Sequence, residues 1–452
     1  MEKHFIYGMS VEGENFTDRT RETQRLKKDF EHGMNVILIS PRRMGKTSLV
    51  KKVKAEISDP HIRIVMMDIY DCRSEYDFYN RFAASILKET SNKMEQTLEN
   101  VKKFLVRLTP KISFSPEPLS EYSMSLGISP ENYTPEEILN LPEVIAKEKG
   151  IHIVICIDEF QQIGEMPDSL SIQKRMRGVW QHQTHVSYCL YGSKKHLMTN
   201  LFQNKRMPFY QFGETNELSA ISTQDWVPFI QSRFEKNRQF ISADYASRIC
   251  EYVGNHSSYV QQLAWNIMVE TDKEVNEESF ANGWKAMLAQ CSSYFREQIR
   301  GLSSYQMNFI RLLCSGITSD FGSKAHQEMF SLGSKSNITR IKTSLIEREI
   351  VEQEADNSIH LINPVFQRWF TGSHEKPCGL CVDFCQSEQE KLSIYDATQQ
   401  SPELFHFCIK GFSRCICRPI DKVVKDFILS VIHSCRYIIE GFIPKFSYFA
   451  IP

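Results

Sequence analysis

The eight residues Ser40-Pro-Arg-Arg-Met-Gly-Lys-Thr47 constrain the fold of this chain more than any other stretch, because of what lies on either side of them. Asn35–Ser40 is an apolar run typical of a buried strand, and Lys46–Ile57 has the spacing of a helix. A loop between a strand and a helix offers backbone N–H groups and the positive end of the helix dipole to an anion. The stretch therefore predicts a phosphate-binding loop at the carboxyl edge of a parallel sheet.

From Phe5 to about Ser222, short apolar runs alternate with helical stretches, which is the pattern of a parallel sheet covered by helices. A helix is expected over Asp77–Thr90, and a helical insertion with a Ser/Pro-rich centre over Asn92–Pro142. Residues 1–222 are therefore predicted to form an α/β core of the P-loop NTPase class. The further strands are expected within Ile62–Tyr70, Ile151–Ile157, Val186–Tyr191 and Phe209–Leu218.

After Ser222 the pattern becomes helical, and residues 223–300 are predicted to form a helical lid. Its helices are expected over Asp225–Asn237, Ala243–Val253, Ser258–Thr271 and Glu277–Gln290. Ser303–Phe370 contains three short helical stretches followed by two brief extended runs, so residues 301–370 are predicted to form a winged-helix domain. Residues 371–452 form a Cys-rich tail with little periodicity, for which no structure is predicted.

The residue types in the loop suit a triphosphate. Gly45 lets the backbone approach closely, Lys46 would reach the β and γ phosphates, and the Thr47 hydroxyl would ligate Mg²⁺. Ser40 stands where such loops usually have their first glycine, and a serine fits there if its backbone angles are ordinary. The residues predicted to bind the nucleotide here are Ser40, Pro41, Arg42, Arg43, Met44, Gly45, Lys46, Thr47 and Ser48.

Two carboxylates follow the apolar run Ile153–Ile157, which places both at the carboxyl edge of the sheet. Asp158 is predicted to hold the metal through water, and Glu159 to orient and polarise the attacking water. The alternative is a strand that simply ends in a solvated acidic turn. The loop and the acidic pair together are more specific than either alone.

Two weaker signals complete the predicted catalytic set. Ser193 follows the strand that ends at Tyr191 and could contact the γ phosphate or the water, or could be a plain turn residue. Arg206 could stabilise charge in the transition state, from within the chain or from a neighbouring subunit, although a solvated basic turn is the simpler interpretation.

These motifs, in this order, resemble those of AAA-type ATPases, in particular the STAND-like P-loop ATPases of the archaeal and Bacteroidetes type. The loop of that family usually reads Pro-Arg-Arg-x-Gly-Lys-[Ser/Thr]-Ser-Leu. The resemblance covers about Phe5–Phe370 and is carried by Asn15–Arg19 with Glu22 and Leu26, Ser40–Thr47, Ile153–Glu159, Gly192-Ser193, Gly254–Leu263 and Asn363–Phe370.

The resemblance implies binding of ATP and Mg²⁺, a helical lid, and nucleotide-dependent switching with self-association. It also implies that the Phe16–Arg19 region, with Asp18 and Arg19, lies near the adenine. Ser257 stands where the family has a proline at the start of a lid helix. The resemblance therefore does not decide whether the lid contacts the nucleotide.

The composition of the chain indicates which classes of partner and which cellular compartment to expect. The formal net charge of −1 argues against a protein that coats nucleic acid through general electrostatics. No stretch predicts a secretory signal or a membrane span, since the late apolar run Phe427–Phe442 is short and interrupted by charges. The chain has 13 cysteines, which without an export signal are expected to be reduced. The predicted location is cytoplasmic, with no membrane partner.

The predicted recognition helix of the winged-helix domain is Lys335–Glu349, and the region Ser303–Phe370 as a whole carries comparable numbers of bases and acids. A domain that reads DNA usually presents a basic face. Contact with another part of the chain or with an unknown protein partner is therefore favoured over DNA, which stays the alternative. In the tail, Cys378-x-x-Cys381-x-x-x-Cys385 and Cys415-x-Cys417 lack the two clean pairs of a structural zinc site, so a poorly ordered appendage or a divergent extension is favoured there over zinc binding.

The sequence thus predicts an ATP-binding switch that hydrolyses ATP slowly to ADP and phosphate. The alternative is a DNA-binding winged-helix regulator whose ATPase core controls its assembly. A scaffold with an inactive site is a third interpretation.

Overall fold

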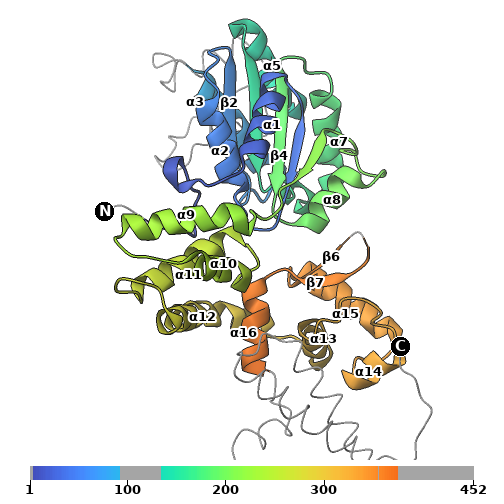
Figure 1. Ribbon diagram of the computed structural model, residues 1–452. Coiled ribbons are helices and arrows are strands. Elements are labelled where there is room, and N and C mark those ends of the chain that lie inside the picture. The colour runs from blue at the N-terminus through green and yellow to red at the C-terminus, as the bar shows by residue number, and fades with distance from the viewer. Residues whose placement is uncertain (1–3, 92–133, 355, 375–452) are drawn as a thin grey trace, which may run out of the picture. The chain divides into compact units, whose positions relative to one another are not determined.

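The computed structural model describes residues 4–91, 134–354 and 356–374, and the account below concerns these residues (Figure 1). The predictions for the Ser/Pro-rich centre of the insertion and for the tail cysteines Cys378, Cys381, Cys385, Cys415 and Cys417 lie outside the described residues. The cysteines that are described, from Cys72 to Cys314, are free thiols, and most of them are buried.

A five-stranded parallel sheet with the order β2-β3-β4-β1-β5 forms the centre of the amino-terminal region. Its strands are β1 (Val36–Ile39), β2 (Ile62–Asp68), β3 (His152–Asp158), β4 (Val186–Gly192) and β5 (Glu214–Glu217). All residues of β1 and β4 are buried, as expected for inner strands that helices cover on both faces. The fold class predicted from the alternating pattern is confirmed.

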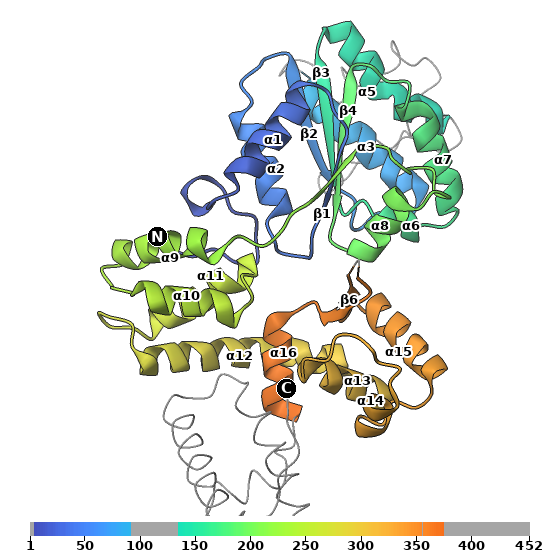
Figure 2. The same ribbon diagram turned by 45° about the vertical axis from the view of Figure 1, so that its right-hand side comes forward.

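The two faces of the sheet are covered by separate helix layers, which are visible on either side of the sheet in Figure 2. In β1, Val36 and Leu38 pack on the side of α1 (Thr20–Glu31) and α2 (Lys46–Glu56). Ile37 and Ile39 point to the other side, because successive side chains of a strand alternate. That side is covered by α3 (Glu75–Thr90), α5 (Pro135–Lys149), α6 (Gln162–Glu165), α7 (Ser169–Trp180) and α8 (Lys195–Gln203).

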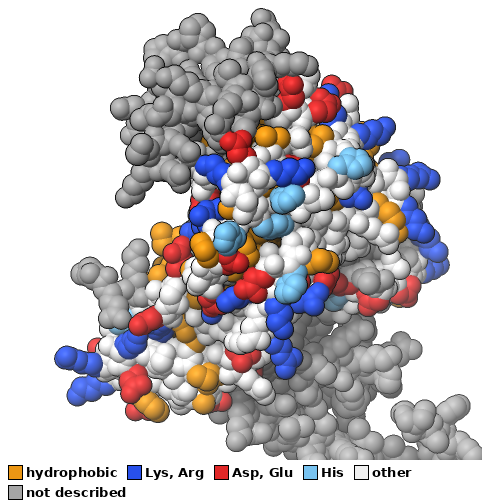
Figure 3. Space-filling view, turned by 90° about the horizontal axis from the view of Figure 1, so that it is seen from above, with side chains coloured by type: hydrophobic (Ala, Val, Ile, Leu, Met, Phe, Trp, Pro, Cys, Tyr) orange, Lys and Arg blue, Asp and Glu red, His pale blue; other side chains and the backbone are white. Residues whose placement is uncertain are grey.

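The amino-terminal edge of the sheet is polar, and Figure 3 shows histidine side chains gathered on this face. His152 opens β3, and His185 immediately precedes β4. Burial acts to raise the pKa of Glu143 in α5, but hydrogen bonds from His185, Lys147 and Thr184 outweigh it and hold that pKa at about 2. The ionised Glu143 therefore fastens α5 to the start of β4, on the edge away from the phosphate-binding loop.

After the sheet come α9 (Thr223–Lys236), α10 (Ala243–Tyr252), α11 (Ser257–Val269) and α12 (Glu277–Ile299). α12 continues beyond the expected end at Gln290, because its apolar face extends to Phe295. The Phe295 ring lies 5.5 Å from that of Phe366 and 5.3 Å from that of Trp369. The long helix thus carries one apolar core from the predicted lid into the region that follows.

That region contains α13 (Ser304–Cys314), α14 (Lys324–Met329), α15 (Lys335–Glu347) and the antiparallel pair β6 (Val351–Gln353) and β7 (Ile359–Leu361). α16 (Pro364–His374) follows and packs against α12 and α13. Three helices and then a two-stranded ribbon is the order expected for residues 301–370. Among the helices of the described residues, none is both long and apolar enough to cross a membrane.

Helices α11 and α12 cross so closely that only glycine fits at position 283. A Cβ there would lie 2.7 Å from the backbone nitrogen of Ile267 and 2.6 Å from its Cγ1. We expect Gly283→Ala to lower the free energy of unfolding by about 1–3 kcal/mol, the usual cost of overpacking. Urea unfolding followed by circular dichroism measures this. The matched control is Gly178→Ala in α7, where a Cβ meets nothing within 4 Å and the variant should be as stable as the wild type or more so. Equal stabilities of the two variants would contradict the close crossing.

Candidate functional site

The loop between β1 and α2 has the backbone of an anion-binding turn. Arg43 and Gly45 have φ values of 63° and 98°, in the left-handed region, and α2 begins directly after Gly45. Turns that alternate right- and left-handed residues gather successive N–H groups into a concave nest for an anion. Ser40 does not have a positive φ, so a serine is compatible with the position where a glycine was expected.

Lys46 lies under this loop, with its side chain buried. Its Nζ donates to the carbonyl oxygens of Ser40 and Pro41 at 2.7 and 3.0 Å, and to Ser40 Oγ at 3.3 Å. Burial lowers the pKa of Lys46 to about 8, although the nearby carboxylates of Asp158 and Glu159 act in the opposite direction. A cation held in this way is poised to exchange loop carbonyls for phosphate oxygens.

The loop and the acidic strand end are in direct contact. Thr47 Oγ1, at the start of α2, donates to Asp158 Oδ2, at the end of β3, at 2.7 Å. The backbone N–H of Glu159 donates to the other oxygen of Asp158 at 2.9 Å. Burial raises the pKa of Asp158 to about 6, and the charges of Glu159 and Asp68 add to this effect against the Thr47 hydrogen bond. Asp158 is thus half-buried and hydrogen-bonded, whereas a solvated acidic turn would leave its carboxylate in water.

Glu159 adopts a left-handed conformation with φ of 54°, and its carboxylate is held by other side chains. Ser193 Oγ donates to Glu159 Oε2 at 3.0 Å, and Arg42 Nε donates to Ser193 Oγ at 3.3 Å. Gln161 Nε2 donates to the same Oε2 of Glu159. Sequence reasoning placed Ser193 here but missed Gln161. No sequence signal marked Gln161, because its role depends on its burial, with 2% of the residue exposed, against Glu159 and the end of β4.

A cavity of about 470 Å³ opens beside these groups, within the usual size range of ligand pockets. Arg42, Arg43, Gly45, Lys46, Thr47 and Ser48 line it, together with Asp68, Asp158, Glu159 and Ser193. The predicted lid contributes Ser257, Ser258 and Gln261 from α11, so Ser257 does face the site.

The amino-terminal segment Ile6–Val11 forms another wall of this cavity, and sequence reasoning did not identify it. The backbone N–H of Val11 donates to Ser48 Oγ at 2.9 Å, and that of Ile6 donates to Gln261 Oε1 at 2.8 Å. The segment therefore connects α2 to α11 across the mouth of the site. Neither the composition of Ile6–Val11 nor any motif in it predicts that the segment forms a wall of the cavity.

Several residues predicted for the site do not line the cavity: Asp18, Arg19, Ser40, Pro41, Met44 and Arg206. Arg19 is buried and donates to the carbonyl oxygen of Met44 at 3.3 Å, while it pairs with Glu22 at 2.9 Å. It thus supports the loop from behind, where the resemblance implied a place near the adenine. Arg206 lies in an exposed turn, and its N–H donates to Asn204. Within this chain Arg206 is not brought to the cavity.

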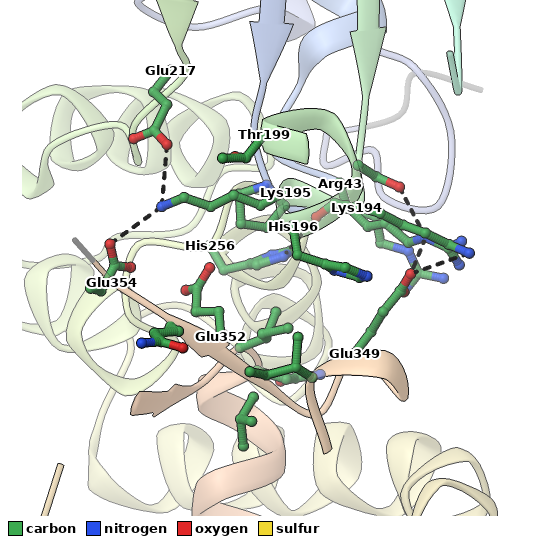
Figure 4. Close-up of a pocket in the computed structure, with 18 of the residues that line it drawn as sticks. Arg43, Lys194, Lys195, His196, Thr199, Glu217, His256, Glu349, Glu352 and Glu354 are labelled. Atoms are coloured by element: carbon green, nitrogen blue, oxygen red, sulfur yellow. Dashed lines mark hydrogen bonds and ion pairs between the residues drawn. The ribbon is translucent and has the colours of Figure 1, made fainter. Parts of the chain in front are cut away.

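A second cavity, of about 790 Å³, lies between the loop region and the β6–β7 ribbon (Figure 4). Lys194 lies 3.7 Å from Glu349, and Arg42 Nε lies 3.9 Å from the same carboxylate. Lys195 pairs with Glu217 at 3.2 Å and with Glu354 at 3.3 Å. The acidic residues around the ribbon therefore face basic residues of the core.

A residue of the predicted lid also contacts the loop here. His256 Nε2 lies 3.0 Å from the carbonyl oxygen of Arg42. Burial lowers the pKa of His256 to about 4, so the ring is neutral near pH 7 and donates through Nε2–H. The predicted lid is thus in contact with both cavities.

The donor set at Thr47 and Asp158 fits Mg²⁺. A hydroxyl and a carboxylate oxygen are hard ligands, and Mg²⁺ is commonly held by one or two such groups with phosphates and waters. In the described residues, no group of three or more His, Cys, Asp or Glu side chains is arranged to hold a metal on its own. A metal at Thr47 and Asp158 would therefore be shared with a phosphate ligand.

Known structures share this arrangement of elements. The chain is similar to the Walker-type ATPase PABY2304 of Pyrococcus abyssi, with a TM-score of 0.60 and 14% identity over 81% of this chain and 99% of that one. It is also similar to the ORC2 protein of Aeropyrum pernix in its ADPNP–ADP complexes, with a TM-score of 0.51 and 12% identity over 79% and 94% of the two chains. At these identities the likeness shows the fold, which is that of a P-loop ATPase.

No protein-family model matches the sequence, and no curated protein matches it.

The buried charge of Asp158 predicts a cost in stability. Because the pKa of Asp158 in the folded protein is about 6, above its ordinary value of 3.8, the folded state loses stability as pH rises through this range. We expect Asp158→Asn to stabilise the nucleotide-free protein by about 2 kcal/mol at about pH 7.5, and the gain to vanish by about pH 4. Unfolding midpoints at the two pH values measure this.

The matched control is Asp272→Asn, which makes the same change at an exposed position of the lid and should leave stability unchanged at both pH values. A destabilised Asp158→Asn protein at about pH 7.5 would contradict the assignment of a poorly solvated charge at Asp158.

Proposed function

We propose that this protein binds ATP with Mg²⁺ and hydrolyses it to ADP and phosphate. The observation that carries the proposal is the 2.7 Å hydrogen bond between Thr47 and Asp158. It brings the lysine-bearing loop and the acidic strand end to one cavity, so that a single triphosphate can contact both. The fold shared with Walker-type ATPases supports the same conclusion.

The residues divide the work of phosphoryl transfer as follows. Backbone N–H groups of the loop and the Lys46 ammonium bind the β and γ phosphates, and Lys46 also offsets charge that develops in the transition state. Glu159 orients a water and accepts its proton as the water oxygen bonds to the γ phosphorus and the bond to the β-phosphate oxygen breaks. Thr47 and Asp158 would hold Mg²⁺, which supplies further charge neutralisation on the phosphates.

We further propose a nucleotide-dependent switch of the AAA/STAND type, with residues 1–222 as core, 223–300 as lid and 301–370 as winged helix. Arg42 supports this because it contacts Ser193 at 3.3 Å on one side and Glu349 at 3.9 Å on the other. A change at the γ phosphate would therefore alter the ion pair of Arg42 with Glu349, which lies between α15 and β6. Self-association and an unknown protein partner belong to the same proposal, as does a cytoplasmic location.

Within the part of the chain that the structure describes, no specific observation favours the DNA-binding alternative. Glu349, Glu352 and Glu354 line the cavity between the ribbon and the core, and acidic side chains such as these would repel a phosphate backbone. A mobility shift on duplex DNA that persists as salt rises would revive that alternative.

The central test is magnesium-dependent release of phosphate by the purified chain. We expect Lys46→Ala to lose ATP binding, because the cation that contacts the phosphates is gone. We expect Glu159→Gln to bind ATP yet release phosphate at least about a hundredfold more slowly, because the water is no longer polarised. The control is Lys174→Ala, an exposed lysine of α7. If the wild type ignores ATP, or if Glu159→Gln hydrolyses it normally, the proposed activity is wrong.

The switch predicts that the acidic residue after α15 holds the ribbon on the core. Glu349→Lys would place a cation beside Arg42 and Lys194, and we expect it to release the ribbon. The radius of gyration should rise, and turnover of ATP should rise severalfold because Arg42 is freed. Small-angle X-ray scattering and phosphate release measure the two effects.

The matched control is Glu347→Lys, which makes the same change of charge at an exposed position in the last turn of α15. If both variants behave alike, net charge and not the ribbon contact is responsible. Unchanged dimensions and turnover in Glu349→Lys would exclude the proposed coupling.

A further inference from the structure

Gln161 is a buried polar side chain beside the carboxylate that the proposed reaction uses. It lies in the turn between β3 and α6, and the residue is 2% exposed. Its Nε2 donates to Glu159 Oε2, and the opposite assignment of the amide would place two oxygens against each other. The orientation of the side chain is therefore fixed by the charge of Glu159.

The two donors around Glu159 act on the same oxygen. Ser193 Oγ donates to Oε2 at 3.0 Å from the end of β4, and Gln161 donates to Oε2 from the other strand end. With Oε2 held on two sides, the carboxylate cannot rotate freely, and Oε1 is the oxygen left to accept from a water. Fixing a carboxylate in this way is what a base or a water-orienting group requires.

A glutamine is a costly choice at this position for stability alone. Its Oε1 is buried and has no hydrogen-bond partner among the described protein atoms. A buried acceptor without a partner costs about 1–3 kcal/mol, which an apolar side chain of similar size would avoid. The neighbours Phe160 and Ile163 are fully buried apolar residues, so an apolar side chain would suit the environment. Residues that break a local rule in this way are expected at functional sites.

Gly192 provides the space that Gln161 needs. A Cβ at position 192 would lie 1.9 Å from Gln161 Oε1 and 2.9 Å from Met198 Sδ. Any other residue there would push the glutamine away from Glu159, whereas the thioether of Met198 can adapt. Glycine at the last position of β4 is thus matched to glutamine after β3.

We propose that Gln161 is a positioning residue for Glu159, and that Gly192 keeps the place of Gln161 open. The inference rests on the proposed function of Glu159 as the group that orients water. It gives a part in the rate of hydrolysis to two residues that do not line the cavity beside the loop. Their effect is on the rate of hydrolysis and not on nucleotide affinity.

The first test compares Gln161→Met with Gln162→Met, the same change one residue further on, where the side chain is half-exposed. We expect Gln161→Met to lower kcat about tenfold, the loss of one charge-assisted hydrogen bond, with the Kd for a non-hydrolysable ATP analogue unchanged. Because the substitution removes the unpaired buried Oε1 of Gln161, the unfolding midpoint should equal that of the wild type or exceed it. Gln162→Met should match the wild type. An unchanged or raised kcat in Gln161→Met overturns the inference.

The second test is a double-mutant cycle between positions 161 and 192. Gly192→Ala alone should lower kcat about as much as Gln161→Ala alone, because it displaces the same side chain. In the Gln161→Ala background, Gly192→Ala should add little, since the atom it would strike is gone. Additive losses overturn the pairing of the two residues.

The same assays separate this inference from the proposed function. If wild type hydrolyses ATP and Glu159→Gln does not, the proposed function stands, and a normal Gln161→Met then rejects the inference alone. If wild type shows no hydrolysis, the proposed function fails, whatever the nucleotide affinity of the variants.

Discussion

The hydrogen bond from Thr47 to Asp158 is the contact on which the rest of the site depends. It connects the first turn of α2 to the end of β3, two elements that are separated by 111 positions in the sequence. β1 pairs with β4, and β4 with β3, so the loop and the acidic pair come from strand ends on either side of β4. Ser193, at the end of β4, lies between them. The order of the strands thus brings the loop, the acidic pair and Ser193 to neighbouring strand ends.

This arrangement places ionisable groups where water cannot solvate them well. Burial lowers the pKa of Lys46 and raises that of Asp158, so each charge is unfavourable when no ligand of opposite charge lies beside it. Phosphates would compensate the charge of Lys46, and a divalent cation that of Asp158. The buried amide oxygen of Gln161, which lacks a hydrogen-bond partner, lowers the stability of the fold further. Stability given up at such a site is recovered when a ligand of the right charge binds. The buried apolar layers on both faces of the sheet supply the stability that makes this tolerable.

The sequence predicted the fold well because apolar runs and helical spacing are local signals. All five strands and the helices over the lid lie close to their expected ranges, and α12 extends further only because Phe295 meets residues of α16. The loop and the acidic pair could also be predicted, since the residue types that suit a phosphate and a metal are contiguous in the sequence, and their roles remain predictions. Gln161, Gly192 and the segment Ile6–Val11 could not, because their roles come from packing between distant parts of the chain. The place of Arg19 behind the loop likewise depends on tertiary contacts.

One line of polar contacts extends from the ribbon to the proposed water-orienting carboxylate. Glu349 lies 3.9 Å from Arg42, Arg42 donates to Ser193 at 3.3 Å, and Ser193 donates to Glu159 at 3.0 Å. Arg42 cannot serve a phosphate, Ser193 and Glu349 equally well at once, because its donors form one planar fork. In the switch that we propose, drawing Arg42 toward the phosphate would weaken its ion pair with Glu349 and alter the support of Glu159. Nucleotide state, ribbon position and the geometry of the carboxylate would then be linked through the guanidinium group of Arg42.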